Sequence, residues 1–386
     1  MSYNERIIYK PLALKKVFRL AVRQAPKKYA FFYHKLKNSL DNQLILFEEG
    51  RTAFERFDNG KGLLQADTGW NELGDQISVY EEGNDKKGIP LPPLTTLVDA
   101  SFNILNITPD QDDPIVIMLC MAALAGEVEN NTPYHNNDHY RKVMMCTIKR
   151  IAEMEARAHR ENVAPPFSEK EKLLLLTAAC IHDLDHQGHA NKNTDPKRNE
   201  IHSYNLFAPI FESVGVDNET KRQLKQILIA SDVTLYENSV SPYSDLKSFI
   251  NGGAILSYKF AHKEFEGISE RTAELGLFFS ECDLMPSLMF GVDRLVRESA
   301  YVFKEIFSRY PKGNYNSENN SFKTFIENFL SGIAGNIKAD FNIPLKDRIA
   351  FLKNKISGLK EDELLGVLLP RQKEKYDPPS GRRLDY

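Results

Sequence analysis

Residues 173–186 read LLLLTAACIHDLDH, in which an apolar run from Leu173 to Ile181 is followed directly by His182-Asp183-Leu184-Asp185-His186. An apolar run of this kind predicts a buried helix when a helix start precedes it. Such a start is present, because Ser168 followed three residues later by Glu171 forms a capping-box pattern. The sequence therefore predicts a core helix whose polar end carries imidazole and carboxylate side chains.

Helical periodicity extends through most of the chain after Pro93. We expect helices over residues 114–126, 140–160, 168–181, 202–214, 218–231, 270–282, 293–310 and 322–333. Few segments alternate with the period of two that marks a strand. The predicted fold class is therefore all-α, with many helices.

Composition excludes several classes of protein. The 386 residues carry 50 Lys and Arg against 53 Asp and Glu, a formal charge of −3, which does not favour a nucleic acid polymer as partner. The four cysteines form no CxxC pattern, which argues against a disulfide framework and favours the cytoplasm. The longest apolar stretches, Pro114–Ala125 and Leu173–Ile181, are shorter than the roughly 18 to 20 residues that span a bilayer. No transmembrane helix is expected.

The N-terminal segment has a charge of its own. Residues 1–40 contain ten Lys and Arg side chains against one acid, Glu5. An apolar stripe at helical spacing predicts a basic amphipathic helix; it consists of Leu14, Val17, Phe18 and Ala21. Such a helix could bind an anionic membrane surface or an acidic partner, or it could simply pack on its own domain. A mitochondrial presequence is less favoured, because serines are scarce.

Composition also suggests four regions. Residues 1–48 form the basic amphipathic segment, and residues 49–92, rich in glycine and proline, predict an irregular lead-in. Residues 93–369 form the main helical domain, and residues 370–386 form a polar tail.

Two histidine-rich groups suggest a metal site. The first is Tyr134-His135-Asn136-Asn137-Asp138-His139, where the two histidines share one face if the segment is helical. The second is the polar end of the core helix, His182 to His186, and a further aspartate, Asp283, is expected to end the apolar helix over residues 270–282. Two imidazoles and two carboxylates suit Zn²⁺, and an aspartate can bridge to a harder ion such as Mg²⁺ or Mn²⁺.

The chemistry of such a pair of ions is known in general terms. Two ions about 3.5 to 4 Å apart activate a water molecule for attack on phosphorus and stabilise the leaving oxygen. A histidine that binds no metal has a pKa of about 6.5 and can protonate that oxygen. The residue types therefore favour phosphoester hydrolysis.

These motifs resemble the catalytic domain of class I cyclic nucleotide phosphodiesterases, within the HD-domain metallohydrolases. Residues 134–139 match the family pattern YHNxxH, and residues 179–191 match AxxHDxDHxGxxN. Weaker similarity extends from about Leu91 to Leu369, where Ile229-Ala230-Ser231-Asp232 is similar to xATD and Cys282-Asp283-Leu284 to ADL. The resemblance implies an all-helical fold and a cyclic nucleotide as the small-molecule substrate.

The resemblance also implies roles for single residues. It places zinc on His139, His182, Asp183 and Asp283, with Asp183 bridging to Mg²⁺ or Mn²⁺. It makes His135 the general acid for the 3′ oxygen, and it gives Glu200 and His186 supporting roles toward the catalytic water. The residues implied to bind substrate are Tyr134, Asp232, Phe322 and Phe325.

The sequence departs from the family in the substrate pocket. The family binds the purine through a glutamine in a pattern like SQxxFI, whereas this chain has Ser321-Phe322-Lys323-Thr324-Phe325-Ile326. Phe325 fits the position that stacks on the base, but Phe322 replaces the glutamine. Because an aromatic clamp discriminates less sharply than paired hydrogen bonds, selectivity for cAMP or cGMP is not specified. Gln226 and Asn328 are possible substitutes for the amide.

Two other functions remain open from the sequence. The loss of the glutamine is compatible with an HD hydrolase that cleaves another nucleotide phosphoester. The basic N-terminal segment is compatible with a binding or effector protein whose pocket is catalytically silent. Metal content and a phosphoester panel discriminate among the three.

Overall fold

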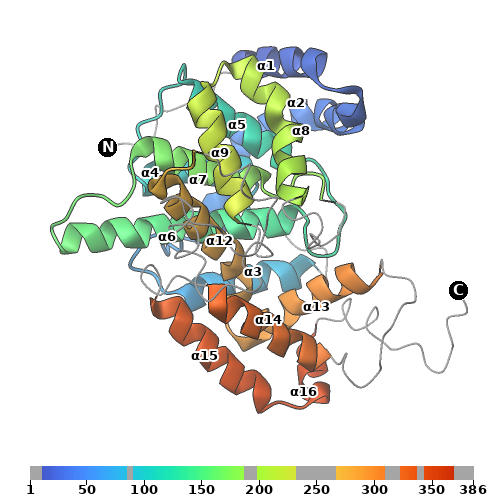
Figure 1. Ribbon diagram of the computed structural model, residues 1–386, viewed down its shortest axis with the longest axis vertical. Helices are drawn as coiled ribbons and strands as arrows, with labels where there is room; N and C mark the ends of the chain where they lie inside the picture. The colour runs from blue at the N-terminus through green and yellow to red at the C-terminus, as the bar shows by residue number, and fades with distance from the viewer. Residues whose placement is uncertain are drawn as a thin grey trace, which may run out of the picture.

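The structure, a computed structural model, describes residues 11–84, 90–186, 198–231, 267–308, 322–336 and 343–368. Every regular element in these ranges is helical, and they contain no strand, so the all-α prediction is confirmed. Figure 1 shows the helices arranged with α1 and α2 at one end of the molecule and α15 and α16 at the other.

The N-terminal part is built from three α-helices and a short 3₁₀ turn: α1 (Pro11–Gln24), η1 (Lys27–Tyr29), α2 (Ala30–Asp58) and α3 (Trp70–Asn84). The apolar stripe predicted for α1 is buried, mainly against α8 (Arg198–Val214). The basic amphipathic helix is thus confirmed, and its apolar face packs on the protein itself.

The prediction of an irregular lead-in over residues 49–92 is wrong for most of that range. Helix α2 continues to Asp58, and α3 begins at Trp70. Tertiary packing overrides the local turn signals, because Leu73 and Ile77 of α3 are fully buried in the core. Buried ion pairs add to this, since Glu81 of α3 contacts Lys142 at 3.3 Å and also pairs with Arg294.

The core consists of helices that pack on one another around buried aliphatic and aromatic side chains. It contains α4 (Leu94–Ile104), α5 (Pro114–Gly126), α6 (Asn137–Arg160), α7 (Glu169–Ile181), α9 (Asn218–Ala230) and α12 (Glu270–Leu288). Helix α7 packs against α5 and α6, and α12 packs against α6 and α9. The predicted capping box is present at the start of α7, where Ser168 and Glu171 bond reciprocally. Three of these helices, α6, α7 and α12, carry the metal-ligating candidates.

The C-terminal helices cover one side of this core. They are α13 (Val292–Ser308), α14 (Phe322–Asn336), α15 (Ile343–Ser357) and α16 (Glu361–Gly366). Helix α13 packs on both α12 and α14. Within the described residues, no single helix is both long and apolar enough to cross a membrane, and α12 with α13 reach that composition only as a pair bent by 106°.

Candidate metal centre

The turn after α7 brings three candidate ligands to one place. His182 is the C-cap of α7, and the chain then reverses through bonds from the Leu184 amide to the Ile181 carbonyl (3.2 Å) and from the His186 amide to the Asp183 carbonyl (3.0 Å). Asp185 adopts a left-handed conformation, with φ of 55°, which aspartate tolerates better than most residues. The HDLDH pattern therefore encodes a tight turn as well as a set of ligands.

The opposite wall of the site is the start of α6. Asn136 is its N-cap, and the Oδ1 atom accepts bonds from the amides of Asp138 (3.0 Å) and His139 (3.2 Å). Asn137 donates to the carbonyls of Gly126 (2.7 Å) and Val128 (3.1 Å), which fixes the loop between α5 and α6. The two asparagines of YHNNDH thus set the direction in which His139 enters the site.

Gly126 allows this loop to approach the end of α7. A Cβ atom at this position would lie 2.6 Å from the carbonyl oxygen of Cys180 and 2.5 Å from Leu94 Cδ1, which are both closer than real contacts. Only glycine therefore fits between α5 and the last turn of α7. The contact places the loop that carries His135 beside the turn that carries His182.

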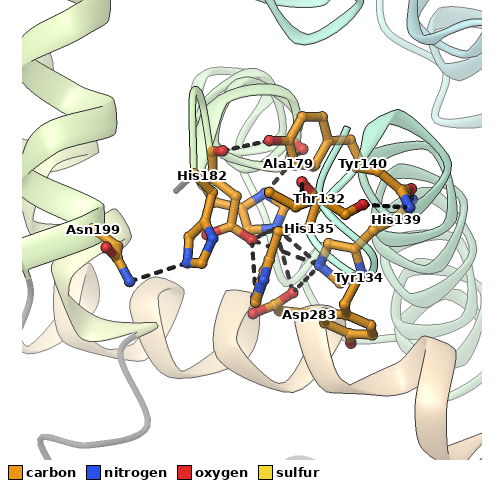
Figure 2. Close-up of polar contacts among 12 residues, drawn as sticks. Thr132, Tyr134, His135, His139, Tyr140, Ala179, His182, Asn199 and Asp283 are labelled. Carbon is orange, nitrogen blue, oxygen red and sulfur yellow. Dashed lines mark hydrogen bonds and ion pairs between the residues drawn. The ribbon is translucent and has the colours of Figure 1, made fainter. Parts of the chain in front are cut away.

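Four ligand atoms from α6, the turn after α7 and α12 converge on one point (Figure 2). His139 Nε2 lies 3.3 Å from His182 Nε2, 3.1 Å from Asp283 Oδ1 and 3.8 Å from Asp183 Oδ2. His182 Nε2 lies 3.1 Å from Asp183 Oδ2 and 3.4 Å from Asp283 Oδ1. Segments that are far apart in the sequence therefore build a single cluster.

These five distances lie near the edge lengths of a tetrahedral metal site. Ligands about 2.0 to 2.2 Å from a central ion stand about 3.3 to 3.6 Å apart along each edge of a tetrahedron, and the measured separations scatter around that range. His182 also has the outer bond typical of a ligand, because its Nδ1 donates to the Ala179 carbonyl at 3.2 Å, so Nε2 is the ring nitrogen that can bind an ion. The donor set therefore fits a divalent cation.

One expectation about Asp283 needs correction. The sequence suggested that this residue ends its helix, but α12 continues past it to Leu288 and includes Pro286. The helix accommodates this proline because α12 is buried against its neighbours, which outweighs the loss of one backbone bond. Asp283 consequently projects from a rigid helix interior.

A second group of possible ligands shares Asp183 with the first. His135, Asp183 and His186 each offer an atom within 4.8 Å of the others, and His139, His182 and Asp183 form the other such group. Asp183 is the carboxylate common to both. This arrangement is what a bridging aspartate between two ions requires.

Glu305 of α13, which the sequence analysis did not identify, organises the two remaining histidines. Its Oε1 accepts from His135 Nδ1 at 2.6 Å and lies 3.4 Å from His186 Nδ1. Its Oε2 accepts from the amides of Tyr134 (2.7 Å) and His135 (3.1 Å), and the side chain is only 2 % exposed. An acid on an amphipathic helix resembles a surface residue in sequence, so no local signal marks it.

His135 and His186 lie face to face beside this carboxylate. Their ring centroids are 3.8 Å apart, and Asn199 of α8 donates to His186 Nε2 at 3.1 Å (Figure 2). Because both Nδ1 atoms point toward Glu305, the Nε2 atom of His135 faces Asp183 Oδ2, at 3.8 Å. His135 thus presents Nε2 to the metal cluster, while Glu305 holds Nδ1.

The electrostatics of the cluster follow from burial and pairing. Burial alone lowers the pKa of His135, but the charge of Asp183 and the hydrogen bond that His135 donates to Glu305 outweigh it and raise that pKa. Burial tends to raise the pKa of Asp283, whereas His182 and His139 hold it well below its usual range. Burial lowers the pKa of His139. The carboxylates are therefore ionised, as metal ligands must be.

Two other predicted site residues, Tyr134 and Glu200, lie in the described part of the structure. Tyr134 packs its ring against His135 and His139, with centroids 4.8 and 4.5 Å apart. Glu200 is buried on α8, one residue after Asn199, which contacts His186. Their roles toward substrate and water stay predictions.

The proposed base-binding phenylalanines belong to α14. Phe322 is fully buried and contacts Phe303 of α13, with ring centroids 5.7 Å apart. Phe325 is half-buried and contacts the same ring at 5.3 Å. Asp232 lies outside the described residues. The substrate-binding role of these three residues is therefore untested.

Comparison with known proteins bears on the same residues. The sequence model of the 3′5′-cyclic nucleotide phosphodiesterase family matches residues 134–246, which include both histidine motifs. The resemblance found in the sequence is thus confirmed, and the chain is a phosphodiesterase-like hydrolase. A search of curated proteins gave no significant match. The family is metal-dependent, in agreement with the His and Asp clusters.

Proposed function

We propose that the protein hydrolyses the 3′,5′-cyclic phosphodiester of a cyclic nucleotide to the 5′-monophosphate. The observation that carries this proposal is the convergence of four side chains, in which His139 and His182 each lie 3.1 to 3.8 Å from the carboxylates of Asp183 and Asp283, with His135 beside them. The family match supports the same substrate class.

Zn²⁺ is proposed for the four-residue cluster, because two imidazoles and two carboxylates form a donor set that it prefers. Mg²⁺ or Mn²⁺ is proposed on the other side of Asp183, because the Asp183 carboxylate together with water molecules suits a harder ion. When bound, the two cations supply an activated water and offset the charge of the phosphate.

The protein's own residues would handle the leaving group. Glu305 holds the Nδ1 proton of His135, so any further proton on this ring resides on Nε2, which faces the cluster. That proton can pass to the 3′ oxygen as the P–O bond breaks, which is general acid catalysis. We assign His186 and Glu200 to ordering water next to His135, because His186 stacks on its ring and Glu200 is buried on the helix that contacts His186.

Purified protein supplied with Mn²⁺ or Mg²⁺ tests this function directly. We expect conversion of cAMP, cGMP or both to the 5′-monophosphate, and His135→Ala should reduce the rate by about 10²- to 10⁴-fold while the metal content stays unchanged. Protein that binds both metals but cleaves no cyclic mononucleotide contradicts the proposal.

A second candidate is an HD hydrolase of a non-cyclic phosphoester. It is favoured by Phe322, which stands where the family has glutamine and whose ring is buried against Phe303. A panel of nucleotide phosphoesters decides between the two, because a clear preference for a non-cyclic substrate would reverse their order.

A further inference from the structure

Helices α1 and α2 lie at one end of the molecule (Figure 1), and the outer face of α1 and the first turns of α2 carry exposed basic side chains. Residues 11–40 contain eight Lys and Arg side chains and no Asp or Glu. Because the apolar stripe of α1 is buried, the helix presents its charged side chains outward. The basic surface consists of the exposed residues Lys16, Arg19, Arg23, Lys27, Lys28 and Lys37.

Among the residues that the structure describes, few acids pair with these bases. Lys15, at the edge of the surface, pairs with Asp41 at 2.7 Å. Within the described part of the chain, Lys16, Arg19 and Arg23 form no ion pair. Uncompensated bases on one surface create a field that attracts an anionic partner.

Two large apolar side chains are exposed beside these bases. Leu12 is 83 % exposed and lies one helical turn before Lys16 on the same face of α1. Phe31, at the start of α2, is 68 % exposed, and Lys35 Nζ lies 4.9 Å from its ring centroid. Exposed Leu and Phe side chains flanked by Lys and Arg are the composition of a surface that rests at a membrane interface.

We propose that this surface docks the protein on a bilayer that contains anionic lipids. Lys16, Arg19 and Arg23 contact the headgroups, and Leu12 and Phe31 enter the boundary between headgroups and acyl chains. An acidic protein would satisfy the charges but would give no reason for two isolated apolar side chains to be exposed among them. The inference concerns a surface formed by α1 and α2, and it is independent of the proposed reaction.

Vesicle sedimentation of the full chain tests this docking. We expect binding to phosphatidylcholine vesicles that contain about 30 % phosphatidylserine, no binding to pure phosphatidylcholine, and release at about 0.5 M salt. The triple variant Lys16→Glu, Arg19→Glu, Arg23→Glu should bind at least about 100-fold more weakly, since each base near such a surface contributes about fivefold. Phe31→Ser should weaken binding while leaving the net charge unchanged.

A matched control makes the same change in net charge on other faces. Arg157→Glu, Arg160→Glu and Lys355→Glu replace exposed bases of α6 and α15, and this variant should bind vesicles as the unmodified protein does. Equal loss in both triple variants would show that only total charge matters and would overturn the proposal. Absence of vesicle binding by the unmodified protein, or capture by an acidic protein without any vesicle binding, would overturn it as well.

Discussion

Replacing Glu305 by glutamine tests how the site prepares its general acid. The carboxylate faces two hydrogen-bond donors on each oxygen: backbone amides of Tyr134 and His135 on Oε2, and the Nδ1 atoms of His135 and His186 on Oε1. Glutamine replaces one of the two carboxylate oxygens by an NH₂ group. Either the backbone amides or the imidazole Nδ1–H groups must then face that NH₂ group, which is itself a donor. The backbone amides always carry their proton, whereas each imidazole can move its proton from Nδ1 to Nε2. The NH₂ group is therefore expected to face the imidazoles.

The expected consequence is a histidine in the wrong tautomer without a neighbouring negative charge. His135 then no longer gains a second, readily transferred proton at Nε2. We expect Glu305→Gln to lower kcat by about 10²- to 10³-fold, which corresponds to about 3 to 4 kcal/mol of transition-state stabilisation, with little change in KM. Addition of His135→Ala should cost little more, because the two residues act as one unit.

The assay compares two substrates in the same variant. A cyclic nucleotide needs a proton on its leaving alkoxide, whereas a nitrophenyl phosphodiester releases a weakly basic phenolate that needs none. Glu305→Gln should therefore slow the cyclic nucleotide far more than the nitrophenyl ester. As a control, Glu298→Gln removes another buried carboxylate of α13 and should reduce thermal stability but leave kcat within about threefold. An equal loss on both esters in Glu305→Gln would refute the reasoning.

Three further predictions concern the metal cluster and its supports. Asp283→Ala should bind about one fewer metal ion per chain by elemental analysis, and unchanged stoichiometry would remove Asp283 from the ligand set. Gly126→Ala forces a Cβ atom within 2.6 Å of the Cys180 carbonyl and should destabilise the protein by about 1 to 3 kcal/mol in urea unfolding, whereas Gly332→Ala, with nothing within 4 Å, should not. Burial raises the pKa of Glu81, but Lys142 and Arg294 outweigh it and lower that pKa to about 2, below its ordinary 4.5. The resulting stabilisation is present above about pH 4.5 and is lost as the pH falls toward 2, so Glu81→Gln should flatten the dependence of the unfolding free energy on pH in this window; parallel curves would contradict the assignment.

The sequence predicted those parts of the fold and site that depend on local patterns. The capping box at Ser168 and the apolar stripe of α1 were recovered, because each is a matter of residue spacing along one helix. The convergence of His139, His182 and Asp183 was anticipated from motif resemblance. Their spacing alone left the metal site open.

The features that the sequence did not predict depend on contacts between segments that are far apart in the chain. Residues 70–84 carry turn formers, yet they form α3 because Leu73 and Ile77 reach the core and Glu81 meets two buried cations. Glu305 was missed for a similar reason, since its partners His135 and Tyr134 lie in another part of the chain. Nothing in the local sequence around such residues records the partner that they will meet.

The anchoring of His135 by α13 bears on how the protein can be divided. Asp283 and Glu305 both lie beyond residues 134–246, the segment that identifies the family. A fragment trimmed to that segment would keep both histidine motifs. It would lose Asp283, one of the four proposed metal ligands, and Glu305, which orients His135. The segment that matches the family is therefore shorter than the segment that supplies the proposed site. An expression fragment should extend at least through Ser308, the last residue of α13.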